Sequence, residues 1–316
     1  MNYVGRRNND QRPRVLILGD QQCEHVQAVA HALENLRAQP VIFDSRRFPA
    51  EATISYDPQG EISLSLSGCR YRMSDFRSVY WRSYLGVDPV KIGDNAVDRV
   101  SQRDSQSLLE SLLHAEGPAW FNGYEAWAMH RIKPVQFRHV AQLGIPTPRT
   151  LMTNDPETAT TFSATCKPLI HKPVFGGSRT RKVTDELMDR DRLTRVFRSS
   201  PVTLQQCVEG TNLRTFVIGE SVFSVEIEAT TLDFRADPTH RLIWRNTPEQ
   251  IAQWSRQICH RLHMRWTAID WRIDEKGKLY FLEANPSPMF VGLSRKVGLD
   301  VADHLARAMV DAEPTG

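Results

Sequence analysis

The sequence has 316 residues, 41% of them hydrophobic and 24% charged, with 40 basic residues against 37 acidic ones. This length favours two or three domains over a single core, and the small net charge of +3 gives no general case for nucleic acid as a partner. The five cysteines are scattered, without a Cys-x-x-Cys pair, which argues against a disulfide framework and against a zinc site.

The sequence shows no signal for export or membrane insertion. Residues 1–14 are polar and basic and lack the apolar core of a secretory signal. No uncharged apolar run approaches ~18 residues, so we expect no transmembrane helix and no membrane partner. Together with the unpaired cysteines, these features predict a cytoplasmic protein.

The first third of the chain alternates strand and helix patterns. A strand pattern is followed by a helical one, in which Val26, Val29, Ala30 and Leu33 recur, and then by a second strand. This β-α-β order predicts a parallel sheet. The single Gly19 is too little for a dinucleotide fingerprint, so we predict no nicotinamide site. The expected elements are strands at 14–20, 40–44 and 78–82, a hairpin over 53–66 and a helix over 100–113.

The middle of the chain carries a lysine in front of a glycine-rich turn. A strand at 168–173 places Lys172 just before Gly176, Gly177 and Ser178. Glycines let backbone N–H groups approach phosphate oxygens closely, and a nearby lysine adds positive charge. The Walker phosphate-loop pattern is absent, so this segment taken alone is by default a plain flexible hairpin. The flanking elements are expected to be a helix over 133–143, a strand over 149–153 and a helix opening at 154–156.

The last third of the chain predicts an antiparallel sheet. Apolar residues alternate over 202–210 and 213–227, with a turn at 219–220, as expected of strands that have one covered face. Helical patterns follow over 248–262 and 300–310.

An acid and an amide stand two residues apart at the end of an apolar strand over 279–285. Because residues i and i+2 of a strand point to the same face, Glu283 and Asn285 would present two oxygen ligands side by side. A hairpin turn at 274–278 would bring Asp270 to that face. Two carboxylates and one amide oxygen suit Mg²⁺ beside substrate phosphates, although a lone Glu-x-Asn is also common at ordinary strand ends.

The order of these pieces resembles the ATP-grasp superfamily of carboxylate–amine ligases over residues 122–310. Within it, the chain is similar to the branch that holds the ribosomal-protein glutamate ligases and the graspetide (microviridin-type) peptide macrocyclases. The resemblance rests on Lys133, Lys172 with Gly176-Gly177, Gln205-Gln206-Cys207-Val208-Glu209, Arg214, Asp270, Glu283 and Asn285. The branch is further indicated by Gly19-Asp20 with His25, Phe48-Pro49, the strand at 79–82 and Asp233-Phe234-Arg235.

This resemblance implies a fold class and a domain division. The protein would be α/β (α+β) with the ATP-grasp fold, in which ATP is held between two antiparallel-sheet subdomains. A pre-ATP-grasp α/β domain would span residues 1–121, the central subdomain residues 122–200 and the C-terminal subdomain residues 201–316.

The resemblance also implies a role for each site residue. Two lysines would contact the ATP phosphates, a glycine-rich lid would cover them, a backbone segment would read adenine and an acid would hold the ribose. The lysines would be Lys133 and Lys172, and the lid would be Gly176, Gly177 and Ser178. The adenine segment would be Gln206, Cys207 and Val208, and the acid would be Glu209. Two Mg²⁺ ions, or Mn²⁺ in their place, would be held by Asp270, Glu283 and Asn285. Arg214 and Arg235 would steady the acyl phosphate or the acceptor.

The implied activity is ATP-dependent ligation with release of ADP and phosphate. A carboxylate would become an acyl phosphate, which an amine or hydroxyl then attacks, and such phosphoryl transfer depends mainly on positioned cations. The substrate would be a peptide. A small-metabolite ligase of the amino-acid, dipeptide or glutathione type is the first alternative, and a non-catalytic ATP-binding module is an alternative of another class. Dimers are common in this branch, so a homodimer is a further expectation.

The sequence departs from the family pattern at two places. Gln205-Gln206 stands where the family usually has Gln-Glu, a change that a backbone-read adenine tolerates. After Asn285, residues 286–290 differ from the Gly-Gln-Trp-like run of the macrocyclases, which leaves the substrate open. We expect specificity to come from the N-terminal domain and from a loop over 230–245.

Overall fold

The computed structural model describes residues 12–176, 180–229, 231, 237 and 239–313. Contacts divide the chain into two compact units. The N-terminal unit comprises residues 1–124 together with 289–316, and the central unit comprises residues 125–288. The three-part division at 121 and 200 remains a prediction, and the structure differs from it by grouping the last 28 residues with the N-terminal unit.

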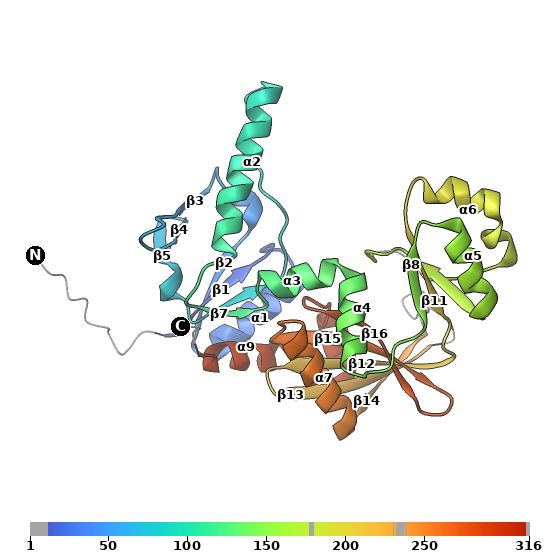
Figure 1. The fold of residues 1–316 in the computed structure, drawn as a ribbon. Coiled ribbons are helices and arrows are strands. Elements are labelled where there is room, and N and C mark those ends of the chain that lie inside the picture. Colours follow the sequence, from blue (N-terminus) through green and yellow to red (C-terminus); the bar gives the residue numbers. More distant parts are fainter. Residues whose placement is uncertain (1–11, 177–179, 230, 232–236, 238, 314–316) are drawn as a thin grey trace, which may run out of the picture. The chain divides into compact units, whose positions relative to one another are not determined.

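The N-terminal unit is built on a four-stranded sheet with the order β2-β1-β6-β7, whose paired strands are all parallel (Figure 1). The β-α-β prediction for this part is therefore confirmed. A small antiparallel sheet, β3-β4-β5, contains the predicted hairpin and one further strand. The strands are β1 (Arg14–Leu18), β2 (Gln39–Phe43), β3 (Ala52–Ser55), β4 (Ser63–Leu66), β5 (Cys69–Arg72), β6 (Ser78–Trp81) and β7 (Ala119–Phe121).

Helices from both ends of the chain cover the parallel sheet. The described helices of this unit are α1 (Glu24–Asn35), α2 (Asn95–Leu112), α8 (Val291–Val297) and α9 (Val301–Asp311), with short 3₁₀ turns at Ser45–Arg47 and Met73–Asp75. Helix α9 packs against α1 and β6, and its buried residues recur at helical spacing. The Ser78 hydroxyl donates to the Met309 carbonyl over 3.0 Å. The last helix thus completes the N-terminal core.

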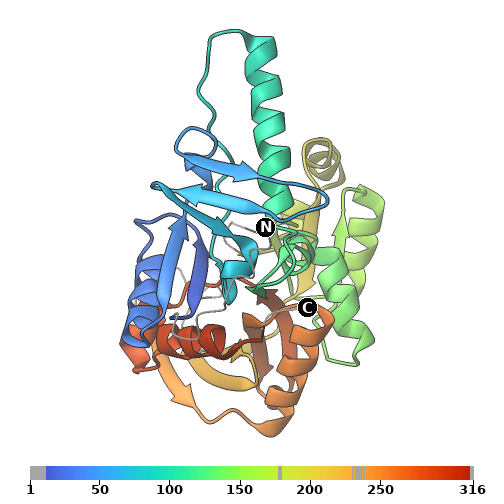
Figure 2. The same ribbon diagram turned by 90° about the vertical axis from the view of Figure 1, so that its left-hand side faces the viewer.

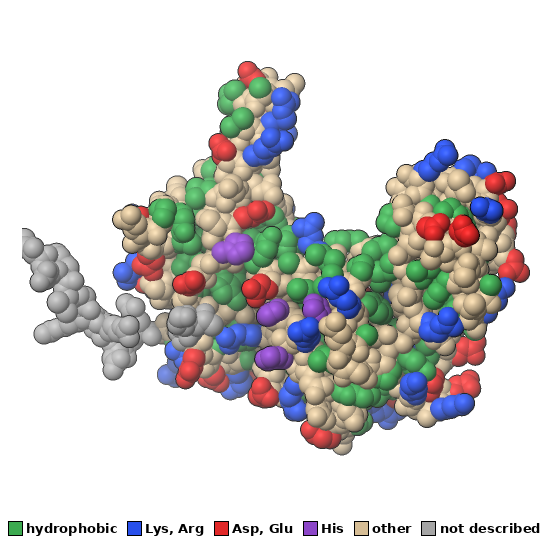
Figure 3. All heavy atoms as spheres, in the orientation of Figure 1, with side chains coloured by type: hydrophobic (Ala, Val, Ile, Leu, Met, Phe, Trp, Pro, Cys, Tyr) green, Lys and Arg blue, Asp and Glu red, His purple; other side chains and the backbone are tan. Residues whose placement is uncertain are grey.

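Helix α2 extends beyond the two sheets of its unit (Figure 2). Its buried residues are Ser105, Leu109 and Leu112, all in its second half. The first half exposes Val97 and Val100, and the spheres of Figure 3 show hydrophobic and basic side chains on this part. Asp94 caps the helix by accepting from two backbone N–H groups.

The central unit contains two antiparallel sheets. The first has the order β10-β9-β11-β8 and is covered by α5 and α6, with a core of Ala159, Leu193, Phe197 and Leu204. Its elements are β8 (Thr150–Thr153), α5 (Pro156–Thr165), β9 (Leu169–Lys172), β10 (Arg181–Lys182), a 3₁₀ turn (Asp185–Met188), α6 (Arg190–Phe197) and β11 (Val202–Gln206).

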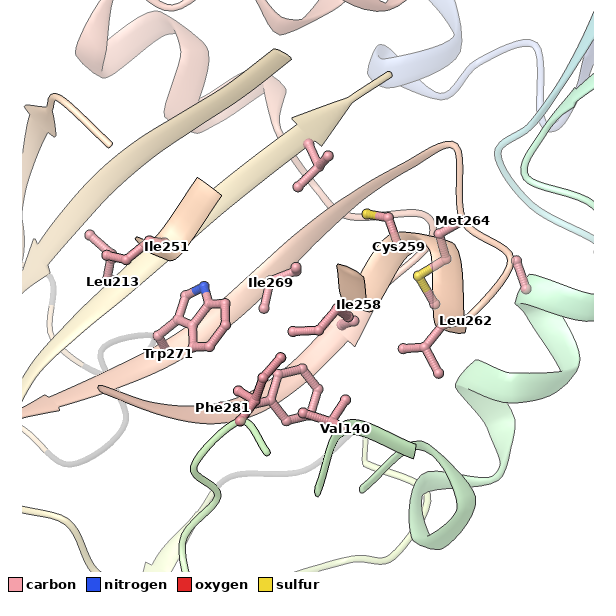
Figure 4. Close-up of a cluster of buried hydrophobic side chains, with 14 residues drawn as sticks. Val140, Leu213, Ile251, Ile258, Cys259, Leu262, Met264, Ile269, Trp271 and Phe281 are labelled. Atoms are coloured by element: carbon pink, nitrogen blue, oxygen red, sulfur yellow. The ribbon is translucent and has the colours of Figure 1, made fainter. Parts of the chain in front are cut away.

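The second sheet has the order β14-β13-β12-β15-β16, with every pair antiparallel. One face packs on α4 and α7, and Figure 4 shows Trp271 and Phe281 pointing toward Val140 and Ile258 in this core. Its elements are β12 (Gly210–Ile218), β13 (Ser221–Glu228), β14 (Arg241–Arg245), β15 (Trp266–Asp274) and β16 (Leu279–Asn285), with the helices α3 (Tyr124–Arg131), α4 (Lys133–Gln142) and α7 (Glu249–Arg261).

The predicted loop over 230–245 is corrected in its last part. Arg241–Arg245 forms strand β14, which pairs with β13 through Val225 and Trp244. None of its five residues is buried, so the sequence gives no pattern that separates this strand from a loop. Among the described residues, no helix is both long and apolar enough to span a membrane.

Candidate functional site

The predicted hairpin of β15 and β16 is confirmed, and it carries the three expected oxygen ligands on one face. Asp270 lies opposite Glu283, and Ala268 lies opposite Asn285. A bulge follows at once, because Trp271 pairs with Phe281 and not with Leu282. Bulges bend a strand locally and re-aim its side chains next to functional sites. The neighbouring residues Ile269 and Ala284 point to the opposite face and are fully buried in the core.

Arg214 holds Asp270 from the adjacent strand β12. The two residues lie directly opposite each other. The guanidinium donates from Nε to Oδ1 over 2.7 Å and from Nη2 to Oδ2 over 2.8 Å. Burial opposes the charge of Arg214, but the Asp270 carboxylate outweighs it and raises the pKa of the arginine. This two-point contact fixes the plane of the Asp270 carboxylate.

Lys133 holds Glu283 from the start of helix α4. Its ammonium lies 2.6 Å from Oε1 of Glu283 and 3.1 Å from Nδ1 of His130. Burial lowers the pKa of Lys133 although Glu283 opposes that effect, since only 6% of the lysine surface is exposed. Burial alone would raise the pKa of Glu283, yet the charge of Lys133 lowers it. The ion pair thus favours the charged form of both groups.

The backbone between the two predicted ligands of β16 is held by a second residue of α4. Gln136 donates from Nε2 to the Ala284 carbonyl over 3.0 Å and accepts from the Ala284 N–H over 3.1 Å. His130 Nδ1 also lies 3.2 Å from the Ala284 carbonyl. Sequence reasoning missed both His130 and Gln136. The available signal for Gln136 was its spacing of three residues from Lys133, which places the two on neighbouring turns of α4. His130 belongs to the preceding helix α3, so no helical spacing relates it to Lys133.

Asn285 is oriented by its own turn. Its Oδ1 accepts from the Ser287 N–H over 2.9 Å, and its carbonyl accepts from the Thr267 hydroxyl over 2.7 Å. An amide oxygen has two lone pairs, so Oδ1 retains one for a cation. Together Asp270, Glu283 and Asn285 offer two carboxylates and one amide, the hard-oxygen set that Mg²⁺ shares with phosphates and water.

The set of protein groups that could bind a metal ion here is small. Among the residues that the structure describes, no group of three or more His, Cys, Asp and Glu side chains could hold a metal ion by itself. An all-protein cage is therefore not formed by the described residues. The arrangement fits a cation that takes its remaining ligands from a substrate.

Lys172 lies at the end of β9, beside the strand β11 that leads into the predicted adenine segment. Its ammonium donates to Oε1 of Gln205 over 3.0 Å, and the amide of that glutamine donates to the Thr150 hydroxyl over 2.8 Å. The charge of Lys172 also contributes to lowering the pKa of Glu283. Both predicted lysines thus act electrostatically on the same carboxylate.

A cavity of about 80 Å³ opens beside Lys172 and the segment 206–208, with Ile170 and Leu282 on its walls. The N–H groups of Gln206 and Cys207 donate to backbone carbonyls, each over 2.8 Å. Within the described part of the chain, the Val208 N–H forms no such bond. This leaves a backbone donor at the cavity, next to the exposed carboxylate of Glu209.

Of the remaining predicted site residues, some lie in the described part of the chain and others do not. Gly176 follows β9 with a φ of 101°, a conformation that favours glycine. Gly177, Ser178 and Arg235, and with them the Asp233-Phe234-Arg235 run, lie outside the described residues. Within the central unit, the structure brings Lys133, Lys172, Arg214 and the two acids into one electrostatic cluster.

Comparison with known proteins places this chain in a family. The family described as "RimK-like ATP-grasp domain" matches residues 130–309. No curated protein sequence matched the chain. The ATP-grasp ligase PsnB, solved with a minimal precursor, is 29% identical with a TM-score of 0.83, and the match covers 95% of this chain and 99% of PsnB.

Two further structures have the same fold at lower identity. The macrocyclase MdnC of Microcystis aeruginosa MRC, bound to the precursor peptide MdnA, is 20% identical with a TM-score of 0.82, covering 95% of this chain and 100% of MdnC. A RiPP-associated ATP-grasp ligase of Chryseobacterium gregarium, in complex with ADP and a leader and core peptide, is 18% identical with a TM-score of 0.81, covering 96% of this chain and 98% of that one. With a family match over more than half of its length and this shared fold, the chain belongs to the RimK-like ATP-grasp ligases.

Proposed function

We propose that the chain uses ATP to activate a carboxylate as an acyl phosphate and joins it to an amine or hydroxyl, with a peptide as substrate. The observation that carries this proposal is the face of the β15–β16 hairpin. There Asp270, Glu283 and Asn285 stand beside the cations of Lys133 and Arg214. Phosphoryl transfer needs little covalent help from a protein and depends on positioned charge.

The nucleotide would run from the cavity beside Val208 to the hairpin face. The cavity is smaller than the roughly 300–1,000 Å³ of whole-ligand pockets, so it would take the adenine end only. The Val208 N–H would donate to the base and Glu209 would hold the ribose. Lys133 and Lys172 would contact the phosphates, with Gly176, Gly177 and Ser178 as the covering turn.

The metal ligands would be Asp270, Glu283 and Asn285, which would hold two Mg²⁺ ions or Mn²⁺ in their place. A bound ion would neutralise charge on the transferred phosphoryl group. Lys133, which binds Glu283 in the structure, would also donate to a phosphate oxygen. Arg214 orients Asp270, and with Arg235 it would steady the acyl phosphate. PsnB was also solved with Mg and ADP beside its precursor, which supports ATP and Mg²⁺ here.

The reaction balances without a further co-reactant. A carboxylate oxygen attacks the γ-phosphorus of ATP and ADP leaves. The amine or hydroxyl then attacks the acyl carbon, phosphate leaves, and the surplus proton passes to solvent. The likeness to PsnB favours a peptide over an amino acid or dipeptide as the carboxylate partner.

The test is Glu283→Gln, which keeps the shape of the side chain and removes its charge. We assay ADP release from ATP with a pool of synthetic peptides that contain Glu or Asp together with Lys, Ser and Thr. We expect wild type to release ADP, and not AMP, only when peptide is present, and the variant to lose at least about 100-fold in rate, as for removal of a charge-positioning group.

Glu275→Gln is the matched control, since Glu275 is an exposed acid in the turn of the same hairpin. It should keep the wild-type rate. Full activity of Glu283→Gln would contradict the metal assignment. Turnover with amino acids or dipeptides, but not with peptides, would contradict the peptide substrate, and ATP binding without any ADP release would favour a non-catalytic module.

A further inference from the structure

Gln136 is a buried polar side chain whose hydrogen bonds, among the described residues, go to the backbone between two of the predicted ligands. It is 0% exposed, and its amide forms two hydrogen bonds to one residue, Ala284. Among the described strands, β16 is the outer one of its sheet and pairs with β15 alone. The N–H and carbonyl of Ala284 that bind Gln136 therefore lie on the edge of the sheet that no other strand covers.

The glutamine amide replaces the missing neighbour strand. One N–H donor and one carbonyl acceptor in a fixed plane are what an adjacent strand would offer to Ala284. Left without partners in a buried position, these two backbone groups would each destabilise the fold. An edge of this kind is normally covered by water or by another element. At Ala284 it is covered by the Gln136 amide, with the His130 ring near the same carbonyl.

The position of this contact matters more than its energy. Ala284 separates Glu283 from Asn285, so its two peptide groups set how those side chains stand relative to each other. The same helix turn supplies Lys133, which binds Glu283 directly. Helix α4 therefore holds the Glu-Ala-Asn tripeptide at two points, once through a side chain and once through the backbone.

We infer that Gln136 is a positioning residue for the metal site, with the His130 ring supporting the same carbonyl over 3.2 Å. This inference rests on the proposed role of Glu283 and Asn285 as metal ligands. Residues that orient ligands without touching the ion typically contribute about 10–100-fold in metal affinity. Gln136 acts through the backbone of Ala284, so removing it loosens both ligands together.

The experiment measures Mn²⁺ binding to the full-length protein by electron paramagnetic resonance in the presence of ADP. Gln136→Ala removes both hydrogen bonds. Gln136→Glu keeps the acceptor for the Ala284 N–H and removes the donor to its carbonyl. Gln142→Ala is the matched control, because Gln142 lies at the end of the same helix, is exposed and forms side-chain hydrogen bonds with Arg261 and His139, away from Ala284. All variants are first checked for folding by circular dichroism well below their Tm.

We expect Gln136→Ala to bind Mn²⁺ about 10–100-fold more weakly, Gln136→Glu to bind it more weakly than wild type, and Gln142→Ala to match wild type. Raising the metal concentration should restore turnover of Gln136→Ala, because its ligands are loosened and still present. A lower Tm with wild-type Mn²⁺ affinity in the folded protein would overturn the inference and leave Gln136 a purely structural residue.

Glu283→Gln is measured alongside, so that failure of this inference is separated from failure of the metal site. If Glu283→Gln weakens Mn²⁺ binding and Gln136→Ala does not, only the positioning role is wrong. If Glu283→Gln leaves Mn²⁺ binding unchanged, the metal site itself is wrong.

Discussion

His25 is a buried imidazole at the start of α1, with 3% of its surface exposed. Its ring meets that of Phe290 edge to face at 4.7 Å, and its Nδ1 accepts from the Phe290 N–H over 3.5 Å. Burial, with the charge of Arg82 as the second cause, lowers the pKa of His25 from 6.5 to about 4. The folded protein therefore holds this ring neutral where the unfolded chain would protonate it.

This shift predicts that acid destabilises the N-terminal unit before carboxylates titrate. Between pH 6.5 and about 4 the unfolded chain binds more protons, so stability falls as pH falls through this window. We expect a loss of about 2 kcal/mol in unfolding free energy from pH 7 to pH 5, measured by urea denaturation. His25→Phe should remove most of this loss. His31→Gln, an exposed change on the same helix, should retain it. An unchanged pH dependence in His25→Phe would contradict the assignment.

For individual residues of the site, the sequence predicted those set by local spacing and missed contacts between distant parts of the chain. The Glu-x-Asn spacing and the hairpin turn place three oxygen ligands on one strand face, and both features are local in sequence. The contact of Lys133 with Glu283 spans 150 residues, and that of Gln136 with Ala284 spans 148. No spacing rule reaches that far. Lys133 was predicted through family resemblance, and Gln136 was missed because a helical glutamine usually faces solvent.

At the level of the elements, the junction between β11 and β12 requires glycine at one position. Gly210 begins β12 directly after Glu209, with a φ of 136°. A Cβ atom there would lie 1.9 Å from the Ile273 carbonyl oxygen of β15. The chain passes so close to β15 that only glycine fits, and this close approach fixes where the predicted ribose-binding acid stands.

We therefore expect Gly210→Ala to lower the unfolding free energy of the central unit by about 3 kcal/mol or more, through both the backbone conformation and the clash. Gly292→Ala in α8 is the control, since its Cβ would meet nothing within 4 Å. That change should be neutral or stabilising by up to about 1 kcal/mol. Equal unfolding midpoints in urea for Gly210→Ala and wild type would show that the junction can relax.

Element prediction succeeded where the hydrophobic pattern was long and failed where it was short. Strands β12, β13, β15 and β16 are seven or more residues long and were predicted with their turns. Strand β10 has two residues, both exposed, and gives no pattern. Helix α6 buries only Leu193 and Phe197, four residues apart in a charged segment. A helical segment with so few buried residues cannot be distinguished from a loop by sequence until its packing partner, here α5, is known.

At the scale of the whole molecule, the chain leaves the N-terminal unit near Tyr124 and returns to it after Pro288. A contiguous C-terminal domain was the natural expectation from sequence, because the helical pattern of α9 shows an apolar face but not what it covers. The structure places that face on α1 and β6, where Arg77 also donates to the Val310 carbonyl over 3.3 Å. Tertiary contacts, and not sequence order, assign this helix.

The packing of α9 on the N-terminal core predicts which of the two units a core mutation destabilises. Leu305 in α9 and Leu262 after α7 are both 0% exposed, one in each unit. Each Leu→Ala change should cost about 2–5 kcal/mol by loss of burial and creation of a cavity. In hydrogen–deuterium exchange, Leu305→Ala should speed exchange in β1, β6 and α1, although those elements lie more than 200 residues earlier in the chain. Leu262→Ala should instead speed exchange in β12 and β15. If both variants loosened the same strands to the same degree, the two units would unfold as one and the return of α9 to the N-terminal core would not be a separate source of its stability.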